Sequence, residues 1–520
     1  MTQGQKFAST PARRALFGAV GVFALIAAAG AAFETALPPA PARAATEAAT
    51  APVSGGPASF ADVVDRVKNA VVSVKVRMVE GGGNAGSQGD GGGQGGHRGG
   101  GRDFKGGSPF PPGSPMDKFF HQFGDGQFHF GPSRPQVTMA QGSGFFISPD
   151  GYIVTNNHVV ENEKDVKIVT AEGKTIPAKV IGTDPKSDLA LLKVDDGQTH
   201  PFVDFAKHVP RVGDWVIAVG NPFGLGGTVT AGIVSARGRD IGSGPYDNFL
   251  QIDAPVNRGN SGGPTFNGNG HVVGVNTAIF SPSGGSVGIG FAISGDVVQS
   301  VVAQLKSPAH RVTRGWIGVQ IQPVSQDIAD GLGLKSTGGA LVADVQAGSP
   351  ALAAGIKAGD VIVSLDGQPV PGPSDLARRV AALGPDKEAD VSVMRDGKPM
   401  DFKLKLGTLP NTFASAGDAA TKAAPAAAAV SLDKFGMKVE PSPDGKPGVV
   451  TGGVDPSGAA AAAGLKDGDV ILDANGKPVK AATDLTAAID AAKKEGRKAV
   501  LLRVDSAGTL HFVALALAAG

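Results

Sequence analysis

One serine, Ser261, lies in the glycine-rich segment 257–264. A serine hydroxyl attacks a carbonyl only when a neighbouring base removes its proton, and the anion that forms needs hydrogen-bond donors. Glycine permits backbone conformations that a side chain makes costly, so the N–H groups of Gly259 and Ser261 can converge on such an anion. We therefore predict a nucleophile at Ser261 and an oxyanion hole formed by Gly259, Asn260 and Ser261.

A base and an acid for this serine occur upstream. Among nine histidines, His158 follows a short run, 151–155, that predicts a buried strand. Asp188 comes directly before another apolar run, 189–192. An imidazole can take the serine proton when a carboxylate fixes its tautomer. The order histidine, aspartate, serine is that of chymotrypsin-type proteases, so the sequence predicts a triad of His158, Asp188 and Ser261.

Two other interpretations of these residues are less consistent with the sequence. Each residue alone is more often structural: a serine in a glycine turn, a histidine beside valines, an aspartate at a turn. The pattern Gly-x-Ser-x-Gly at 259–263 also fits the nucleophile elbow of α/β-hydrolases, which needs a strand, a sharp turn and a helix. Here a second turn at 267–270 and an apolar run at 271–275 follow instead, which indicates a hairpin.

Five segments in fixed order carry a family resemblance: 155–160, 219–225, 228–235, 257–263 and 288–293. Together they resemble the HtrA/Do-like serine endoproteases of the bacterial cell envelope, and the match runs from about residue 142 to the end of the chain. The resemblance implies a mainly β protein, in which a chymotrypsin-like double β-barrel is followed by two PDZ domains of the α+β class. It also implies a homo-oligomer, a trimer or a multiple of trimers.

The N-terminus has the features of an export signal. Basic residues, among them Arg13 and Arg14, precede an apolar run, 15–33, and Ala42-Arg43-Ala44 offers a small-x-small cleavage site. We predict a signal peptide and a periplasmic protein. An uncleaved membrane anchor is the alternative, since the run is nearly long enough to span a bilayer. The paired arginines leave the export route open.

Composition is consistent with an exported protein of several domains. The chain has 520 residues, no cysteine and a formal net charge of +1. Without disulfides it depends on burial of apolar side chains, which a chain of this length can supply. The near-neutral balance argues against a nucleic-acid partner held by phosphate contacts. No metal and no cofactor are expected.

Residues 81–136 are rich in glycine, serine and proline and cannot bury a core, which predicts a disordered loop. Phe119, Phe120 and Phe123 within it resemble the aromatic residues with which the family's regulatory loop reaches a neighbouring subunit. A linker without a fixed partner is the alternative. The expected segments are a signal peptide at 1–44, an N-terminal helix and first strand at 45–80, the loop at 81–136, the protease domain at 137–305, a first PDZ domain at 306–409, an alanine-rich linker at 410–429 and a second PDZ domain at 430–520.

Short apolar runs alternate with glycine-bearing turns from 137 to 294, a pattern typical of β-sandwiches and barrels. The family's specificity-pocket positions correspond to Val256, Ile279 and Ile289, all aliphatic. No acidic side chain at those positions could pair with lysine or arginine. We expect cleavage after small or medium aliphatic residues such as Val, Ile or Ala.

The C-terminal part repeats itself at an offset of 109 residues, which aligns segment 348–362 with 457–471. The same offset places Ser374 on Thr483, each expected to cap a helix with its hydroxyl. Two copies of one unit indicate two domains.

Both copies resemble PDZ domains, which add an extended peptide as a strand and hold its terminal carboxylate with loop N–H groups. In the first copy the expected peptide-binding residues are Ile317, Gly318 and Val319. Segment 434–437 of the second copy matches the loop less closely. Either copy could instead pack against the protease or another subunit and bind no free peptide.

Taken with the resemblance, these residues predict an ATP-independent serine endopeptidase that forms an acyl-enzyme on Ser261. Its substrates would be unfolded envelope polypeptides, because a strand-binding cleft needs extended chain. Arg239 matches a family position that relays PDZ or loop contacts to the oxyanion site, so C-terminal peptides bound at the first PDZ domain would switch activity. The alternative function is a PDZ-based chaperone or scaffold in which proteolysis is secondary or absent.

Overall fold

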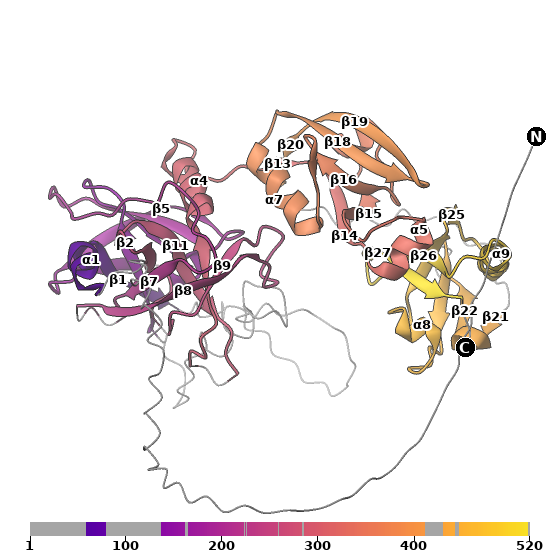
Figure 1. Ribbon diagram of the computed structural model, residues 1–520, viewed down its shortest axis with the longest axis horizontal. Coiled ribbons are helices and arrows are strands. Elements are labelled where there is room, and N and C mark those ends of the chain that lie inside the picture. The colour runs from indigo at the N-terminus through magenta and orange to yellow at the C-terminus, as the bar shows by residue number, and fades with distance from the viewer. Residues whose placement is uncertain are drawn as a thin grey trace, which may run out of the picture. The chain divides into compact units, whose positions relative to one another are not determined.

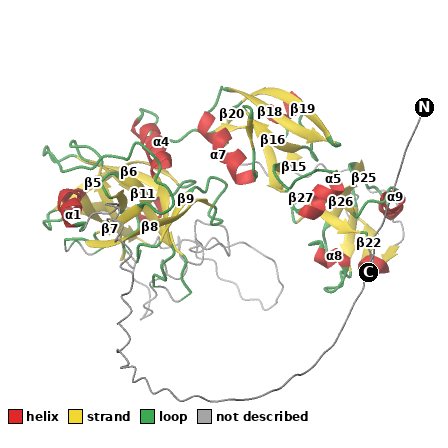
Figure 2. Cartoon of the chain, viewed as in Figure 1, coloured by secondary structure: helices red, strands yellow, loops and turns green. Residues whose placement is uncertain are grey.

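The computed structural model describes residues 59–79, 137–161, 165–222, 224, 226–257, 259–282, 285–410, 430–442 and 447–517. The predicted signal peptide, the loop at 81–136 with its three phenylalanines, and nearly all of the predicted linker lie outside the described residues. Most described elements are strands (Figure 2), which confirms the mainly β class. None of the helices in the described ranges is long and apolar enough to cross a membrane.

A first closed barrel follows helix α1 (Ala61–Val67). Successive side chains of a strand point to opposite faces, and those that point inward fill the barrel. In β4, for example, Val166 and Ile168 are buried while Asp165 and Lys167 are exposed. The barrel is formed, in order of pairing, by β1 (Val71–Val79), β2 (Val137–Phe146), β3 (Tyr152–Thr155), β6 (Leu189–Val194), β5 (Thr175–Asp184) and β4 (Asp165–Val169).

A second closed barrel follows, with its own apolar core that includes Val216, Leu250 and Ile252. Its strands, again in order of pairing, are β10 (Pro264–Asn267), β11 (Val272–Ile279), β12 (Gly290–Ser294), β9 (Phe249–Ile252), β8 (Thr228–Arg239) and β7 (Trp215–Gly220). All residues of β11 are buried. Helix α4 (Gly295–Lys306) leaves this barrel and buries Val298 and Leu305.

The two barrels share one apolar cluster. It joins Phe145 and Leu191 of the first barrel to Ile217 and Phe266 of the second, together with Val298 of α4. A shared, close-packed core fixes the ends of β3 and β6 relative to the strands of the second barrel. The residues that directly follow β3 or directly precede β6 therefore have little freedom of position.

The first of the two C-terminal sheets has the strand order β14-β15-β16-β18-β19, so β14 lies at its edge. A separate two-stranded pair is made by β13 and β20. The bounds are β13 (Gly315–Trp316), β14 (Val319–Pro323), α5 (Gln326–Leu332), β15 (Ala340–Val345), α6 (Pro350–Ala354), β16 (Val361–Leu365), β17 (Gln368–Pro369), α7 (Pro373–Leu383), β18 (Glu388–Arg395), β19 (Lys398–Lys405) and β20 (Gly407–Thr408).

The second sheet repeats much of this design, but its order, β21-β22-β23-β24-β26-β27, places an additional strand beside β22. Figure 1 colours the first sheet orange and the second yellow. The bounds are β21 (Val430–Leu432), a 3-10 turn (Asp433–Phe435), β22 (Met437–Pro441), β23 (Val449–Gly452), α8 (Ala459–Ala462), β24 (Val470–Ala474), β25 (Lys477–Pro478), α9 (Ala482–Lys494), β26 (Ala499–Ser506) and β27 (Thr509–Ala516).

The prediction that Ser374 and Thr483 cap their helices is wrong. Helix α7 begins at Pro373 after Gly372, without a side-chain cap, and α9 begins at Ala482. Proline suits the first helical position, because its fixed φ is preorganised and its missing N–H is not needed there. In α9 the carboxylate of Asp484 accepts the N–H groups of the two residues before the helix instead.

Candidate active site

His158 and Asp188 meet where β3 and β6 lie side by side in the first barrel. His158 lies on the short helix α3 (Asn157–Val160), three residues beyond the end of β3, and Asp188 directly precedes β6. Nδ1 of His158 lies 2.7 Å from Oδ2 of Asp188, and the His158 backbone N–H donates to Oδ1 at 2.9 Å. Asp188 takes a φ of 55°, in the left-handed region that aspartate tolerates better than most residues. The Asp188 carboxylate thus holds both the imidazole ring and the backbone of His158.

The environment of His158 raises the pKa of its imidazole. Burial alone lowers the pKa, but the negative charge of Asp188 and its hydrogen bond raise it, with a further contribution from Glu161, and these effects together prevail. A base with a raised pKa binds the transferred serine proton more firmly. Burial and the charge of Asp188 also raise the pKa of Glu161.

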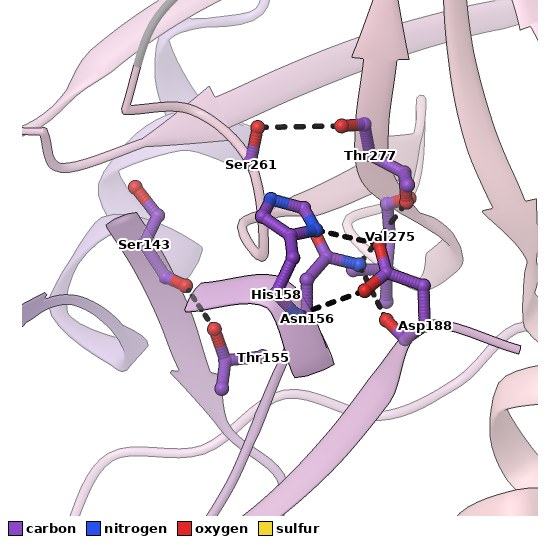
Figure 3. Close-up of polar contacts among 8 residues, drawn as sticks. All are labelled: Ser143, Thr155, Asn156, His158, Asp188, Ser261, Val275 and Thr277. Carbon is purple, nitrogen blue, oxygen red and sulfur yellow. Dashed lines mark hydrogen bonds and ion pairs between the residues drawn. The ribbon is translucent and has the colours of Figure 1, made fainter. Parts of the chain in front are cut away.

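The third predicted residue, Ser261, comes from the second barrel and lies beside this pair. Figure 3 shows the His158 ring between the Asp188 carboxylate and the Ser261 hydroxyl. The hydroxyl donates to the carbonyl oxygen of Thr277 at 3.3 Å. The structure therefore brings the three residues together, with the nucleophile hydrogen-bonded to Thr277.

The loop around Ser261 has its peptide groups fixed by hydrogen bonds. The carbonyls of Gly259, Asn260 and Ser261 accept hydrogen bonds from Ser143 Oγ, Gly263 N and Ser143 N at 2.6, 3.0 and 2.9 Å, respectively. Within the described residues, the N–H groups of Gly259 and Ser261 make no hydrogen bond. These two groups can donate to an oxyanion.

Asn260 differs from its two neighbours in this respect. Its N–H donates to the carbonyl oxygen of Asn257 at 3.1 Å. Of the three residues predicted to form the oxyanion hole, only Gly259 and Ser261 have an N–H group without a hydrogen-bond partner among the described residues.

Asn156 and Thr277 support the site and had no functional prediction from the sequence. The Asn156 amide donates to the carbonyl oxygen of Asp188 at 2.8 Å and to the Thr277 hydroxyl at 3.2 Å. It therefore ties the triad aspartate of one barrel to a residue of the other (Figure 3). The only sequence signal was a polar residue between a strand and His158, which a turn explains equally well.

The predicted pocket residues fall on neighbouring parts of the second barrel. Val256 is 2% exposed and Ile279 5% exposed, both in the core of that barrel. Ile279 pairs with Gly290, the neighbour of half-buried Ile289, across β11 and β12. A Cβ atom on Gly290 would lie 3.3 Å from Cγ2 of Val256. Ile289 packs instead against the apolar cluster that the two barrels share. The place of these three side chains in a specificity pocket stays a prediction.

Arg239 ends β8 and is exposed. Its Nε donates to Oε1 of Gln251 at 2.9 Å. In the parts of the chain that the structure describes, no hydrogen bond or ion pair joins it to segment 259–263. Its relay role stays a prediction.

The predicted peptide-binding loop of the first repeat turns its carbonyls inward. The carbonyls of Ile317 and Gly318 accept from the N–H groups of Ala351 and Gln346, each at 2.9 Å. Gly318 has a φ of 78°, and a Cβ there would lie 2.2 Å from Cβ of Ser349. Val319 begins the edge strand β14. The loop requires glycine at this position.

Comparison with protein families agrees with this architecture. Residues 142–275 match the trypsin-like peptidase domain, and residues 315–406 and 428–504 each match the PDZ domain. The HtrA-type protease AlgW, solved with a decapeptide, is similar with 33% identity and a TM-score of 0.51. That similarity covers 68% of this chain and 100% of the AlgW chain.

Relatives named "probable periplasmic serine endoprotease DegP-like" match over most of their length. The one from Rhizobium meliloti is 48% identical, over 89% of this chain and 92% of the relative. The one from Brucella suis is 47% identical, over 88% and 89%. The chain therefore belongs to the HtrA family of DegP-like periplasmic serine endoproteases, with a trypsin-like domain and two PDZ domains.

Proposed function

We propose that this serine endoprotease cleaves unfolded envelope polypeptides, without ATP, through an acyl-enzyme on Ser261. The observation that carries the proposal is that Ser261 lies beside the His158–Asp188 pair. Next to it, the N–H groups of Gly259 and Ser261 have no hydrogen-bond partner in the part of the chain that the structure describes. A nucleophile, an oriented base and oxyanion donors are the parts that acyl transfer needs.

In the proposed reaction the Ser261 hydroxyl leaves Thr277 and donates to Nε2 of His158. As Ser261 Oγ bonds to the substrate carbonyl carbon, its proton passes to Nε2, while Asp188 stabilises the imidazolium through Nδ1. The N–H groups of Gly259 and Ser261 hold the carbonyl oxygen as it becomes negative. The imidazolium then protonates the leaving amine, and water releases the acyl group by the same steps in reverse order.

The aliphatic character of Val256, Ile279 and Ile289, the positions that match the family's specificity pocket, supports cleavage after Val, Ile or Ala. An arginine or lysine side chain in such a pocket would lose its hydration without a carboxylate to pair with. Profiling with a peptide library tests this, and cleavage chiefly after Arg or Lys would contradict it.

The first PDZ domain is the proposed site for C-terminal peptides, held at Ile317, Gly318 and Val319. Edge strand β14 can accept an added strand, and the similar protease AlgW was solved with a decapeptide. Through Arg239, bound peptide would shift the oxyanion loop between competent and incompetent states. Hydrophobic C-terminal peptides should then change the turnover of a reporter; a flat titration contradicts the switch.

The proposed assembly is a homo-oligomer, a trimer or a multiple of trimers, as the family resemblance implies. Mass measurement on intact particles, with and without an unfolded substrate, tests it directly. A monomer under both conditions would contradict the assembly and leave the catalytic proposal untouched.

Replacement of Ser261 by alanine tests the catalytic proposal against the chaperone alternative. Proteolysis of an unfolded reporter should vanish in Ser261→Ala, and a fluorophosphonate should label the parent at Ser261 only. If the variant still suppresses aggregation of that reporter, the PDZ-based holdase role exists beside proteolysis. A proteolytically active Ser261→Ala protein would refute the assignment of the nucleophile.

A further inference from the structure

Ser143 is a buried hydroxyl of the first barrel that contacts the catalytic loop of the second. It lies on β2 and is 0% exposed. Its Oγ donates to the carbonyl oxygen of Gly259 at 2.6 Å and accepts from the backbone N–H of Asn221 at 2.8 Å. Its own backbone N–H donates to the carbonyl oxygen of Ser261 at 2.9 Å. One residue therefore holds the carbonyls on both sides of Asn260.

The Gly259 carbonyl belongs to the peptide unit that lies between the N–H groups of Gly259 and Ser261, the two that are unpaired among the described residues. Peptide groups are planar, so the Gly259 carbonyl and the Asn260 N–H turn together as one unit. Gly259 has a φ of 86°, a conformation that glycine leaves and enters at little cost, so hydrogen bonds must hold this unit. Its N–H, that of Asn260, donates to the Asn257 carbonyl at 3.1 Å, and its carbonyl accepts from Ser143 Oγ. If the Gly259 carbonyl turned into the cleft, it would place a partial negative charge where the oxyanion forms.

We propose that Ser143 is a positioning residue that keeps the oxyanion hole open by binding the Gly259 carbonyl. This inference rests on the proposed function of Ser261. The hydroxyl does not touch the substrate; it acts through the loop. The Asn221 N–H occupies a lone pair of Ser143 Oγ, which leaves the hydroxyl proton to bind the Gly259 carbonyl.

The test is the rate at which a fluorophosphonate labels Ser261 in the full chain, measured beside peptide turnover. Labelling needs the nucleophile and the oxyanion hole but no peptide in the cleft. In Ser143→Ala, labelling and kcat should fall about 10- to 100-fold, less than the ~10²- to 10³-fold cost of losing a direct donor, with KM nearly unchanged. The matched control is Ser73→Ala: Ser73 is also 0% exposed and lies directly opposite Ser143 on β1.

A second variant keeps the test decisive if Ser143→Ala folds poorly. Ser143→Cys retains a weak donor and should label at a rate between those of parent and alanine variant. Equal labelling rates in parent and Ser143→Ala, or equal losses in Ser143→Ala and Ser73→Ala, would overturn the inference. Failure of the parent to label at Ser261 would instead refute the proposed function.

In the second PDZ domain, the chain itself occupies the sheet edge that would accept a peptide. Strand β21 runs antiparallel to β22, with Val430 opposite Val439 and Leu432 opposite Met437. In the first PDZ domain the corresponding strand, β14, has no such neighbour among the described residues.

The side chains of β21 also fill the place that a peptide's side chains would take. Val430 and Leu432 are half-buried against the core cluster that contains Leu485 and Ile489 of α9. A peptide that binds a PDZ domain pairs with the edge strand in antiparallel fashion beside such a helix. The C-terminal end of β21 lies next to the loop at Phe435 and Gly436. The C-terminus of a bound peptide would occupy the same place, because loop N–H groups hold its carboxylate.

We infer that β21 is an internal ligand that closes the second PDZ domain to peptides until it is displaced. The proposal predicts one bound peptide per chain, at the first domain. The probe is a fluorescent decapeptide with an aliphatic C-terminus, titrated calorimetrically into the full Ser261→Ala chain. Val430→Ser with Leu432→Ser weakens β21 packing and should raise the stoichiometry to two.

A disulfide lock supplies the matched control. The exposed pair Ser431 and Lys438 lies directly opposite across β21 and β22, and the chain has no cysteine of its own. With Ser431→Cys and Lys438→Cys, oxidation should keep the stoichiometry at one. Failure of this disulfide to form, or a stoichiometry of one after the serine substitutions, would overturn the inference. No binding to the parent would refute the first-domain proposal instead.

Discussion

The imidazole Nδ1 of His158 lies 2.7 Å from Oδ2 of Asp188, and the backbone N–H of His158 binds the other oxygen of the same carboxylate at 2.9 Å. Asp188→Asn keeps the size of the side chain but can present an N–H to Nδ1, which selects the wrong tautomer. We expect kcat to fall about 10⁴-fold, as tautomer loss does in other triads. Turnover of a fluorogenic peptide with Val before the cleaved bond measures it.

The chain offers a second histidine–aspartate pair as a control. Nε2 of His200 lies 3.0 Å from Oδ1 of Asp196, in the same barrel. Asp196→Asn should leave kcat within about twofold of the parent, since this pair is outside the catalytic site. Similar losses in both variants would mean that the barrel, and not the tautomer, had been damaged.

The raised pKa of His158 predicts the acid limit of activity. The base works only when neutral, so kcat/KM should fall as the pH drops through the pKa of the free enzyme. Because that pKa is raised, the midpoint should lie above about 6.5, the ordinary value for histidine. Glu161→Gln removes one negative charge that raises the pKa, so it should move the midpoint to lower pH. A midpoint that moves upward in this variant would contradict the electrostatic account.

The sequence predicted which three residues meet at the candidate site, but it did not predict the residues that support them. His158, Asp188 and Ser261 could be identified because nucleophilic catalysis demands those residue types in an order that the chain displays. Ser143, Asn156 and Thr277 could not, because their roles depend on which carbonyl each faces across two barrels. Nothing in a local sequence specifies such a contact.

Strand β21 of the second PDZ domain was likewise not predicted from the sequence. The 109-residue repeat predicted two similar units and both were found, with families matched at 315–406 and 428–504. The repeat could not predict that β21 would pair with β22, because β14, the strand of the first copy that corresponds to β22, has no such neighbour among the described residues. The helix caps expected at Ser374 and Thr483 were wrong for a local reason, since Pro373 and Asp484 provide stronger start signals.

Gly259 should not tolerate a side chain. A Cβ there would lie 2.3 Å from Cβ of Pro222, and its φ of 86° is strained for any other residue. Gly259→Ala should move the loop and lower kcat by at least about 10²-fold, the cost of one oxyanion donor. The control is Gly268→Ala in the same barrel, where a Cβ would meet nothing within 4 Å. Loss of fluorophosphonate labelling in Gly259→Ala alone is the expected result.

Asp184, four residues before the catalytic aspartate, forms a buried ion pair with Arg314. The two residues are 4% and 8% exposed, and Nη1 of Arg314 donates to Oδ1 of Asp184 at 2.9 Å. Arg314→Met leaves the carboxylate buried without its partner, which should destabilise the barrel by about 3–5 kcal/mol. The double variant Asp184→Leu with Arg314→Met should recover most of this loss. Unfolding followed by Trp215 fluorescence in a Trp316→Phe background measures both; equal destabilisation of the single and double variants would contradict the prediction.

Val256 should set the size of the residue that precedes the cleaved bond. The side chain is 2% exposed and lies beside Gly290, so Val256→Ala enlarges the pocket from its wall. One methylene in such a pocket is worth about 1–3 kcal/mol, so the ratio of kcat/KM for Leu over Val substrates should rise about 10-fold or more. Val234→Ala is the control, because Val234 is equally buried in the same core cluster and has no predicted place in the pocket. Both variants lose core packing, but only Val256→Ala should change the ratio. An unchanged ratio in Val256→Ala would contradict the prediction that Val256 lines the pocket, and only Ile279 and Ile289 would remain as predicted pocket residues.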